Sequence, residues 1–141
     1  MNIAQQMARE CATSFAQSFV GVACGGDPEQ MTNEQNVEGV HQLDPWADEV
    51  IQRAARPLAG VISTIHLNLG IERFVIYGGF GLALGEPYRR KLVAFASGGT
   101  WNVGQDWNSM IELGATDGDS GLIGAGRAAA FLRARRDVIR S

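Results

Sequence analysis

Apolar residues recur at helical spacing near the start of the chain. Positions four residues apart carry apolar side chains: Ile3, Met7, Cys11, Phe15 and Phe19. This spacing predicts one amphipathic helix over residues 3–19, which the glycines at 21, 25 and 26 end. Residues 27–43 are polar and poorly periodic, which predicts a loop or a short acidic helix.

A longer helical pattern begins at Asp44-Pro45, where an N-cap residue precedes proline at the first helical position. Apolar residues then keep a helical period from Trp46 to Leu69. Pro57 lies inside this pattern and should kink the helix, and Gly70 should end it.

The second half of the chain predicts two strands with helices between and after them. We expect a strand at Phe74–Tyr77, a helix around Pro87–Ala96, a loop at 98–102 and a second strand at Ser109–Leu113. A last helix should open near Asp119 or Ser120, and its arginines should lie in solvent at its end. The order resembles part of a doubly wound α/β domain. Two strands rarely form a stable sheet, so either residues 20–43 and 98–108 hold further strands or another chain completes the sheet.

Composition narrows the class of protein. The chain has 141 residues, 45% of them hydrophobic, which suits a single domain over 1–141. A net charge of −3 argues against nucleic acid or an anionic membrane as the partner. No apolar run is long enough to span a bilayer, and the N-terminus lacks the pattern of a signal peptide. Cys11 and Cys24 are typical of free thiols, so we expect a cytoplasmic protein.

Two glycines follow the first predicted strand directly. Gly78 and Gly79 stand where a polar turn would be ordinary, and Phe80 comes next. Glycine there favours close approach of the backbone to a ligand or to a neighbouring element. The alternative is a tight strand-to-helix turn that binds nothing.

Several other residues invite a functional interpretation but have a simpler one. The glycines of GLIGAG lack the spacing and the preceding strand of a dinucleotide site, so close packing of the last helix explains them better. His66 should be a core or interface histidine, and His41 a solvated loop residue. Asp119 suits a helix N-cap better than a magnesium site. The loop tryptophans at 101 and 107 should pack on the core or at an interface.

The segments IERFVIYGGFGLALGEPYRRKL and IELGATDGDSGLIGAGRAA together resemble the C-terminal part of the ROK family of sugar kinases and repressors. The stretches DPWADEVIQRAARPLAGVISTIHLNL and ECATSFAQSF are similar to the family's segments that precede them, so the resemblance covers about residues 10–130. It implies an α/β fold: a partial actin/hexokinase-like (ribonuclease H-like) ATPase lobe with few strands flanked by long helices. The family's N-terminal domain and catalytic segment have no counterpart among these residues.

The resemblance also implies a site. In the family, the strand-end glycines lie against the adenosine and α-phosphate of ATP, which would give Gly78 and Gly79 that role, with Phe80 adjacent. ATP with magnesium is the implied cofactor, and the start of the following helix would favour an anion. Cys11 stands at the position of a zinc cysteine, but a lone cysteine cannot hold zinc, so we expect a buried apolar side chain. Thr13 stands where the family has a sugar-binding Glu.

Two functional classes follow from the resemblance. The first is the nucleotide-side half of a sugar or cyclitol kinase, inactive alone and dependent on a partner chain. The second is a non-catalytic oligomerisation or regulatory module, or a truncated kinase remnant. The apolar surface of the predicted helices favours a homodimer or a complementary kinase half as partner, and we expect Val61, Ile65 and Leu69 to lie at that contact.

Overall fold

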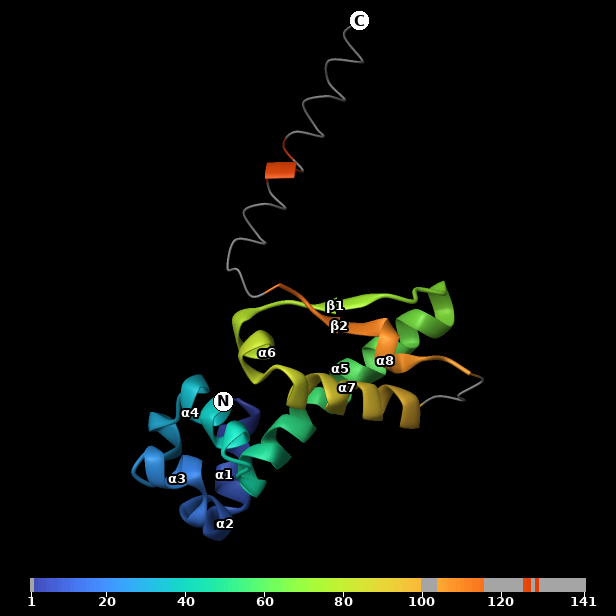
Figure 1. The fold of residues 1–141 in the computed structure, drawn as a ribbon. Coiled ribbons are helices and arrows are strands. Elements are labelled where there is room, and N and C mark those ends of the chain that lie inside the picture. Colours follow the sequence, from blue (N-terminus) through green and yellow to red (C-terminus); the bar gives the residue numbers. More distant parts are fainter. Residues whose placement is uncertain (1, 100–103, 116–125, 128, 130–141) are drawn as a thin grey trace, which may run out of the picture.

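The computed structural model describes residues 2–99, 104–115, 126–127 and 129, and most of these lie in helices (Figure 1). The predicted single helix over 3–19 is wrong. The structure has three short helices in its place: α1 (Ile3–Glu10), α2 (Ala12–Gln17) and α3 (Phe19–Ala23). The first break lies at Cys11 and the second at Ser18.

Ser18 accounts for the second break, whereas at the first break the Cys11 carbonyl oxygen still accepts the Phe15 N–H at 3.0 Å. Ser14 Oγ donates to the Cys11 carbonyl oxygen at 3.0 Å, and Ser18 Oγ donates to the Phe15 carbonyl oxygen at 2.7 Å. Ser18 has extended backbone and caps α3 by accepting from the Gly21 N–H. Serine competes in this way with the helical backbone for its hydrogen bonds. The turn at Ser18 buries Val20 and leaves Phe19 40% exposed, and Cys11 is half-buried rather than buried as predicted.

The helical alternative for residues 27–43 is confirmed. A 3-10 turn, η1 (Pro28–Gln30), precedes α4 (Asn33–His41). Thr32 and Gln35 form a reciprocal capping box at the start of α4. The prediction of His41 in a loop is wrong, because this residue ends α4 and its Nε2 donates to the Ala83 carbonyl oxygen at 3.0 Å.

The long helix α5 (Pro45–Leu69) matches its predicted bounds. Asp44 caps it by accepting from the Trp46 N–H at 3.2 Å. Gly70, with φ 67° and ψ 22°, ends it in the left-handed conformation that glycine tolerates. The helix continues through Pro57, which lies on its exposed side; the kink stays a prediction.

Two short parallel strands form the sheet of the described residues. The first strand, β1 (Phe74–Ile76), pairs with β2 (Ile111–Leu113), with Phe74 opposite Ile111 and Ile76 opposite Leu113. The described part of the connection between them holds three helices: α6 (Gly79–Leu84), α7 (Glu86–Gly98) and α8 (Trp107–Met110). Each strand is shorter than predicted, because Tyr77 follows β1 and residues 109–110 belong to α8. Residues 20–43 contain no strand, so they do not complete the sheet.

Two apolar clusters share α5. Helices α1, α3 and α4 pack around its first half, where Trp46, Val50 and Ile51 are buried. Its second half packs against α7 and the sheet, and this cluster includes Ala55, Ala59, Ile62, Leu92, Ala96, Trp107 and Ile111. Phe74 and Ile76 pack against the second cluster, while Val75 between them is 40% exposed. The sheet therefore covers this core with one face only.

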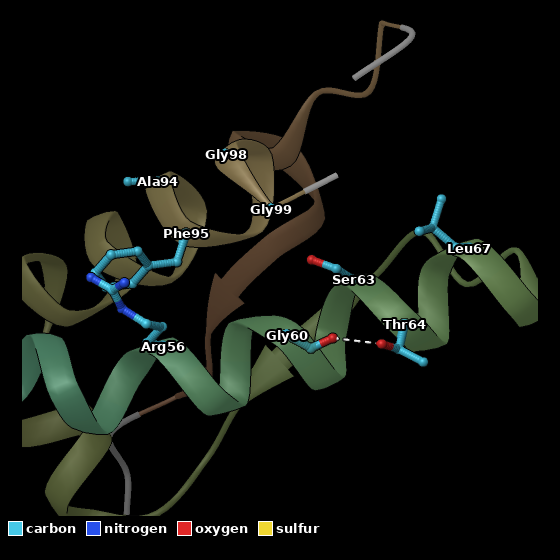
Figure 2. Close-up of a pocket in the computed structure, with 9 residues that line it drawn as sticks. All are labelled: Arg56, Gly60, Ser63, Thr64, Leu67, Ala94, Phe95, Gly98 and Gly99. Carbon is cyan, nitrogen blue, oxygen red and sulfur yellow. Dashed lines mark hydrogen bonds between the residues drawn. The ribbon is translucent and has the colours of Figure 1, made fainter. Parts of the chain in front are cut away.

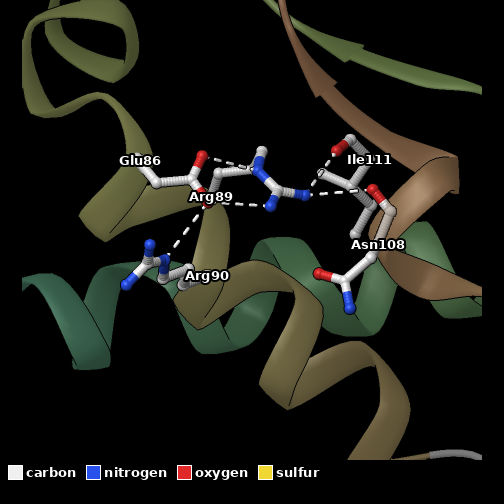
Figure 3. Close-up of polar contacts among 5 residues, drawn as sticks. All are labelled: Glu86, Arg89, Arg90, Asn108 and Ile111. Atoms are coloured by element: carbon white, nitrogen blue, oxygen red, sulfur yellow. Dashed lines mark hydrogen bonds and ion pairs between the residues drawn. The ribbon is translucent and has the colours of Figure 1, made fainter.

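A cluster of charged residues links α7 to β2 (Figure 3). Glu86 accepts two hydrogen bonds from Arg89, each 2.8 Å long. Arg89 Nη1 also donates to the carbonyl oxygens of Asn108, at 3.0 Å, and Ile111, at 3.1 Å. One guanidinium therefore joins the start of α7 to the segment that enters β2.

Much of the far half of α5 remains apolar and exposed. Val61 is 54% exposed, Leu67 59% and Leu69 71%, whereas Ile65 is half-buried. None of the helices in the described part of the chain combines the length and the hydrophobicity needed to cross a bilayer. The predicted last helix lies almost wholly outside the described residues.

Candidate functional site

The turn after β1 is the site that the sequence predicts. Gly78 has φ 108° and ψ 140°, a conformation that only glycine adopts readily. Gly79 begins α6, and the Leu82 N–H donates to the Gly78 carbonyl oxygen at 3.0 Å. Gly78 is therefore required by the turn itself.

Gly79 has no such requirement. Its φ is not positive, and a Cβ built on it would meet no atom within 4 Å. Gly81, two residues further on, differs, because a Cβ there would lie 3.3 Å from Ile76 Cγ2. Packing thus accounts for the glycine at 81 but not for the one at 79. No neighbouring element approaches Gly79 closely enough to require glycine there.

A groove of about 370 Å³ opens beside Gly79, between α4 and α6. Gly79, Phe80 and Ala83 line one side, and Asn33, Glu34, Val37 and Glu38 line the other. Phe80 is 39% exposed and offers its ring to this space. The hydrogen bond from His41 to the Ala83 carbonyl oxygen holds the two helices together at the end of the groove.

The wall that α4 contributes is acidic. The pKa of Glu34 is lowered, because its carboxylate accepts hydrogen bonds from its own backbone N–H and from the Thr32 hydroxyl. Glu38 accepts a hydrogen bond from Gln42 Nε2 at 2.7 Å. Each carboxylate can accept further hydrogen bonds. They can accept hydrogen bonds from hydroxyl groups and they repel a phosphate.

The described residues provide little for a metal ion. No group of three or more His, Cys, Asp or Glu side chains among them is placed to hold one. A magnesium ion on a nucleotide is commonly held by phosphate oxygens and one or two carboxylates. None of the residues that line the Gly79 groove therefore needs to be a dedicated metal ligand.

A larger groove of about 580 Å³ lies between α5 and α7 (Figure 2). The Arg56 guanidinium lies over the Phe95 ring, 4.8 Å from its centroid. The hydroxyls of this groove are already engaged, because Ser63 donates to the Ala59 carbonyl oxygen at 2.9 Å and Thr64 to that of Gly60 at 2.8 Å. These hydroxyls have no further proton to donate, and the Arg56 guanidinium is the charged group that this groove offers.

The other sequence candidates are not part of the Gly79 site. His66 is half-buried on α5, where it hydrogen-bonds the Ile71 carbonyl oxygen and packs edge-on against Trp107. Trp107 is 2% exposed, which confirms its place in the core. Trp101, Gly121, Gly124, Asp117 and Asp119 lie outside the described residues.

Sequence reasoning missed the acidic wall of the groove. Glu34 and Glu38 lie one helical turn apart, but they belong to a segment for which the sequence predicted either a loop or a short helix. The Thr32-x-x-Gln35 capping box is the signal that could have identified the helix. Nothing in the sequence places this helix beside Gly79.

Comparisons with known proteins identify a kinase relative. No protein-family model matches the chain, and no solved structure matches it. The chain is similar to a protein named C(7)-cyclitol 7-kinase from Streptomyces hygroscopicus subsp. limoneus, at 36% identity over 132 residues. The same identity holds for the C(7)-cyclitol 7-kinase of Streptomyces hygroscopicus subsp. jinggangensis (strain 5008). The match covers 90% of this chain and 37% of each relative. The chain is thus a relative of a cyclitol kinase and spans somewhat more than a third of its length.

Proposed function

We propose that this chain forms the nucleotide-side part of an ATP-dependent sugar or cyclitol kinase, with a ROK-like fold of the actin/hexokinase type. A match over 90% of the chain necessarily includes the segment around Gly78. Similarity to a kinase supports the use of ATP with magnesium. The observation that supports this proposal most directly is that neither the turn nor the packing of the chain requires glycine at position 79.

We place the nucleoside in the groove beside Gly79. A side chain at 79 would keep a ligand away from the backbone, whereas glycine lets it approach. The Phe80 ring offers an apolar surface for a base, and the carboxylates of Glu34 and Glu38 can accept hydrogen bonds from ribose hydroxyls. The phosphates would then extend away from α4, because the two carboxylates repel them.

The reaction we propose is in-line transfer of the γ-phosphoryl group. A hydroxyl group of the sugar or cyclitol attacks the γ-phosphorus and loses its proton to a base outside these residues, the bond to the β–γ bridging oxygen breaks, and ADP leaves. Catalysis of this kind depends mainly on positioning and on neutralising the phosphate charge. The residues that activate the hydroxyl and hold the β- and γ-phosphates would come from a segment or partner chain beyond these 141 residues.

Nuclear magnetic resonance titration with ADP tests this site, since it detects weak binding, with dissociation constants of about 1 mM. We expect ADP and adenosine to shift the amide signals of Gly79 and Phe80. Gly79→Val should weaken this response at least about tenfold, since it fills the approach to the backbone. Gly60→Val is the matched control, because Gly60 also lies in open space within a helix. Unchanged shifts in a folded Gly79→Val variant, or no response to ADP in the original chain, would contradict the proposal.

A further inference from the structure

The outer edge of β1 presents backbone groups that the sheet does not use. The Gly114 N–H donates to the Ile76 carbonyl oxygen at 2.9 Å, so the backbone of Ile76 faces β2. In a parallel pair, the preceding residue of the strand then points its N–H and C=O away from the partner strand. Val75 therefore presents both groups on the outer edge of β1. No turn, loop or cap among the described residues supplies a partner for them.

The outer edge of β2 is different. By the same alternation, Ile111 points its carbonyl oxygen away from β1, and Arg89 Nη1 donates to this oxygen at 3.1 Å (Figure 3). The guanidinium therefore occupies the position that a neighbouring strand would take. Glu86 holds it there through two hydrogen bonds, and the Arg89 side chain is only 18% exposed. A strand that joined β2 would have to break these contacts, so the free edge of the described sheet is that of β1.

The two faces of β1 restrict the strand that can join it. Phe74 and Ile76 are half-buried and pack against the second apolar cluster, whereas Val75 is 40% exposed on the opposite face. A strand beside β1 would continue both faces. Its residues level with Phe74 and Ile76 should be apolar, because they would extend the core, and those level with Val75 can be polar. An alternating segment rich in β-branched residues fits this edge.

We propose that the outer edge of β1 pairs with a strand from the remaining part of the kinase. This inference rests on the proposed function, because the partner is the rest of such an enzyme. The chain corresponds to 37% of each cyclitol kinase that it matches, so most of a kinase of that length lies outside these residues. Backbone hydrogen bonds to Val75 would provide affinity, and alternating side chains would provide specificity. A sheet of two strands is marginal alone, and a third strand stabilises it.

Amide hydrogen exchange in the chain alone tests whether this edge is free. We expect the Val75 N–H to exchange at least about tenfold faster than the Ile76 N–H, which faces β2. The measurement is made at two protein concentrations, because pairing between two copies would protect Val75 more at the higher one. Equal exchange at the two positions, at either concentration, would overturn the proposal.

Co-expression with the remaining part of the C(7)-cyclitol 7-kinase, produced as a separate chain, tests the partner. We expect the two chains to copurify, and the Val75 amide to exchange at least about tenfold more slowly in the complex. Val75→Pro should prevent copurification, since proline lacks the N–H that points outward and is tolerated on an edge strand. Val75→Thr is the matched control, because threonine keeps both the N–H and the branched Cβ.

Failure to copurify, or copurification with an unprotected Val75 amide, would overturn the proposal. Full copurification of a folded Val75→Pro variant would do the same, and protection of the Ile76 amide shows that this variant keeps its own sheet. Should Val75→Pro fail to fold, Tyr77→Pro replaces it, because Tyr77 follows β1 and points outward by the same alternation. None of these experiments contains a nucleotide, so the strand pairing and the nucleotide site can fail separately.

Discussion

Arg89 on α7 donates a hydrogen bond of 3.1 Å to the carbonyl oxygen of Ile111, the first residue of β2. The Arg89 side chain is 18% exposed, and Glu86 holds the same guanidinium in a two-point contact. A charged donor to a backbone carbonyl is among the stronger hydrogen bonds of a protein. The strand that pairs with β1, and hence the strand end before Gly78, depends on this contact.

Replacing Arg89 with lysine should therefore destabilise the fold. An ammonium group cannot reach Glu86 and the two carbonyl oxygens at once, and a lost charged hydrogen bond costs about 1.5–3 kcal/mol. Arg90→Lys is the control, because the Arg90 side chain is 76% exposed and surface ion pairs contribute about 0–1 kcal/mol. Urea unfolding measures both free energies. Equal stability of the two variants would show that Arg89 does not support β2.

The same cluster predicts a pH dependence. Hydrogen bonding to Arg89, with Arg90 contributing, lowers the pKa of Glu86 from 4.5 to about 2. Because the folded-state pKa lies below the ordinary value, the stabilisation is present above pH 4.5 and is lost as the pH falls toward 2. Carboxyl chemical shifts should report this pKa, and Arg89→Lys should raise it more than Arg90→Lys does. An ordinary pKa for Glu86 in the original chain would contradict the contact.

Substitution by alanine should have opposite effects on stability at two glycines. A Cβ at Gly39 would lie 2.8 Å from Val20 Cγ2 and 2.9 Å from the Ala47 Cβ. Overpacking of this kind costs about 1–3 kcal/mol, so Gly39→Ala should lower the stability of the first cluster. Gly60 lies in open space inside α5, and Gly60→Ala should raise helix stability by up to about 1 kcal/mol. Thermal melts of the two variants compare them; an unchanged or raised melting temperature for Gly39→Ala would refute the packing around Gly39.

We predict that the chain associates with a second copy through the exposed apolar part of α5. Val61, Leu67 and Leu69 supply this surface, and two-fold pairing is the commonest closed assembly. Light scattering at micromolar concentration should report at least twice the 15.1 kDa chain mass. Val61→Asp should lower that mass. Val22→Asp is the control, because Val22 is 72% exposed on α3, away from this surface. A well-folded species at the monomer mass would show that the chain completes its own core, and would contradict both the homodimer and the complementary kinase half.

Helix α5 and the short helices before it differ in how far the sequence could predict them. The bounds of α5 followed from Asp44, Pro45 and Gly70, which act on the helix end beside them. The predicted helix over 3–19 was wrong because its period says nothing of Ser18, whose hydroxyl donates to the Phe15 carbonyl oxygen and accepts from the Gly21 N–H. Periodicity shows which side of a helix is apolar, whereas capping residues determine where the helix ends.

The sequence likewise predicted only the part of the candidate site that depends on local signals. Gly78 and Gly79 were predicted because glycine after a strand is a local signal. The opposite wall of the groove was not, because Glu34 and Glu38 reach it only through the packing of α4 against α6.

The parallel register of β1 and β2 sets an order of events during folding. Phe74 pairs with Ile111, 37 positions further along the chain (111 minus 74). Closing a loop of that length costs conformational entropy, and this cost comes before the strand pairing contributes any stabilisation. Helices α5 and α7 pack directly against each other and α7 contacts β2, so their docking reduces that cost. The strands should therefore pair late, and their amides should be among the last to gain protection in a refolding experiment monitored by hydrogen exchange.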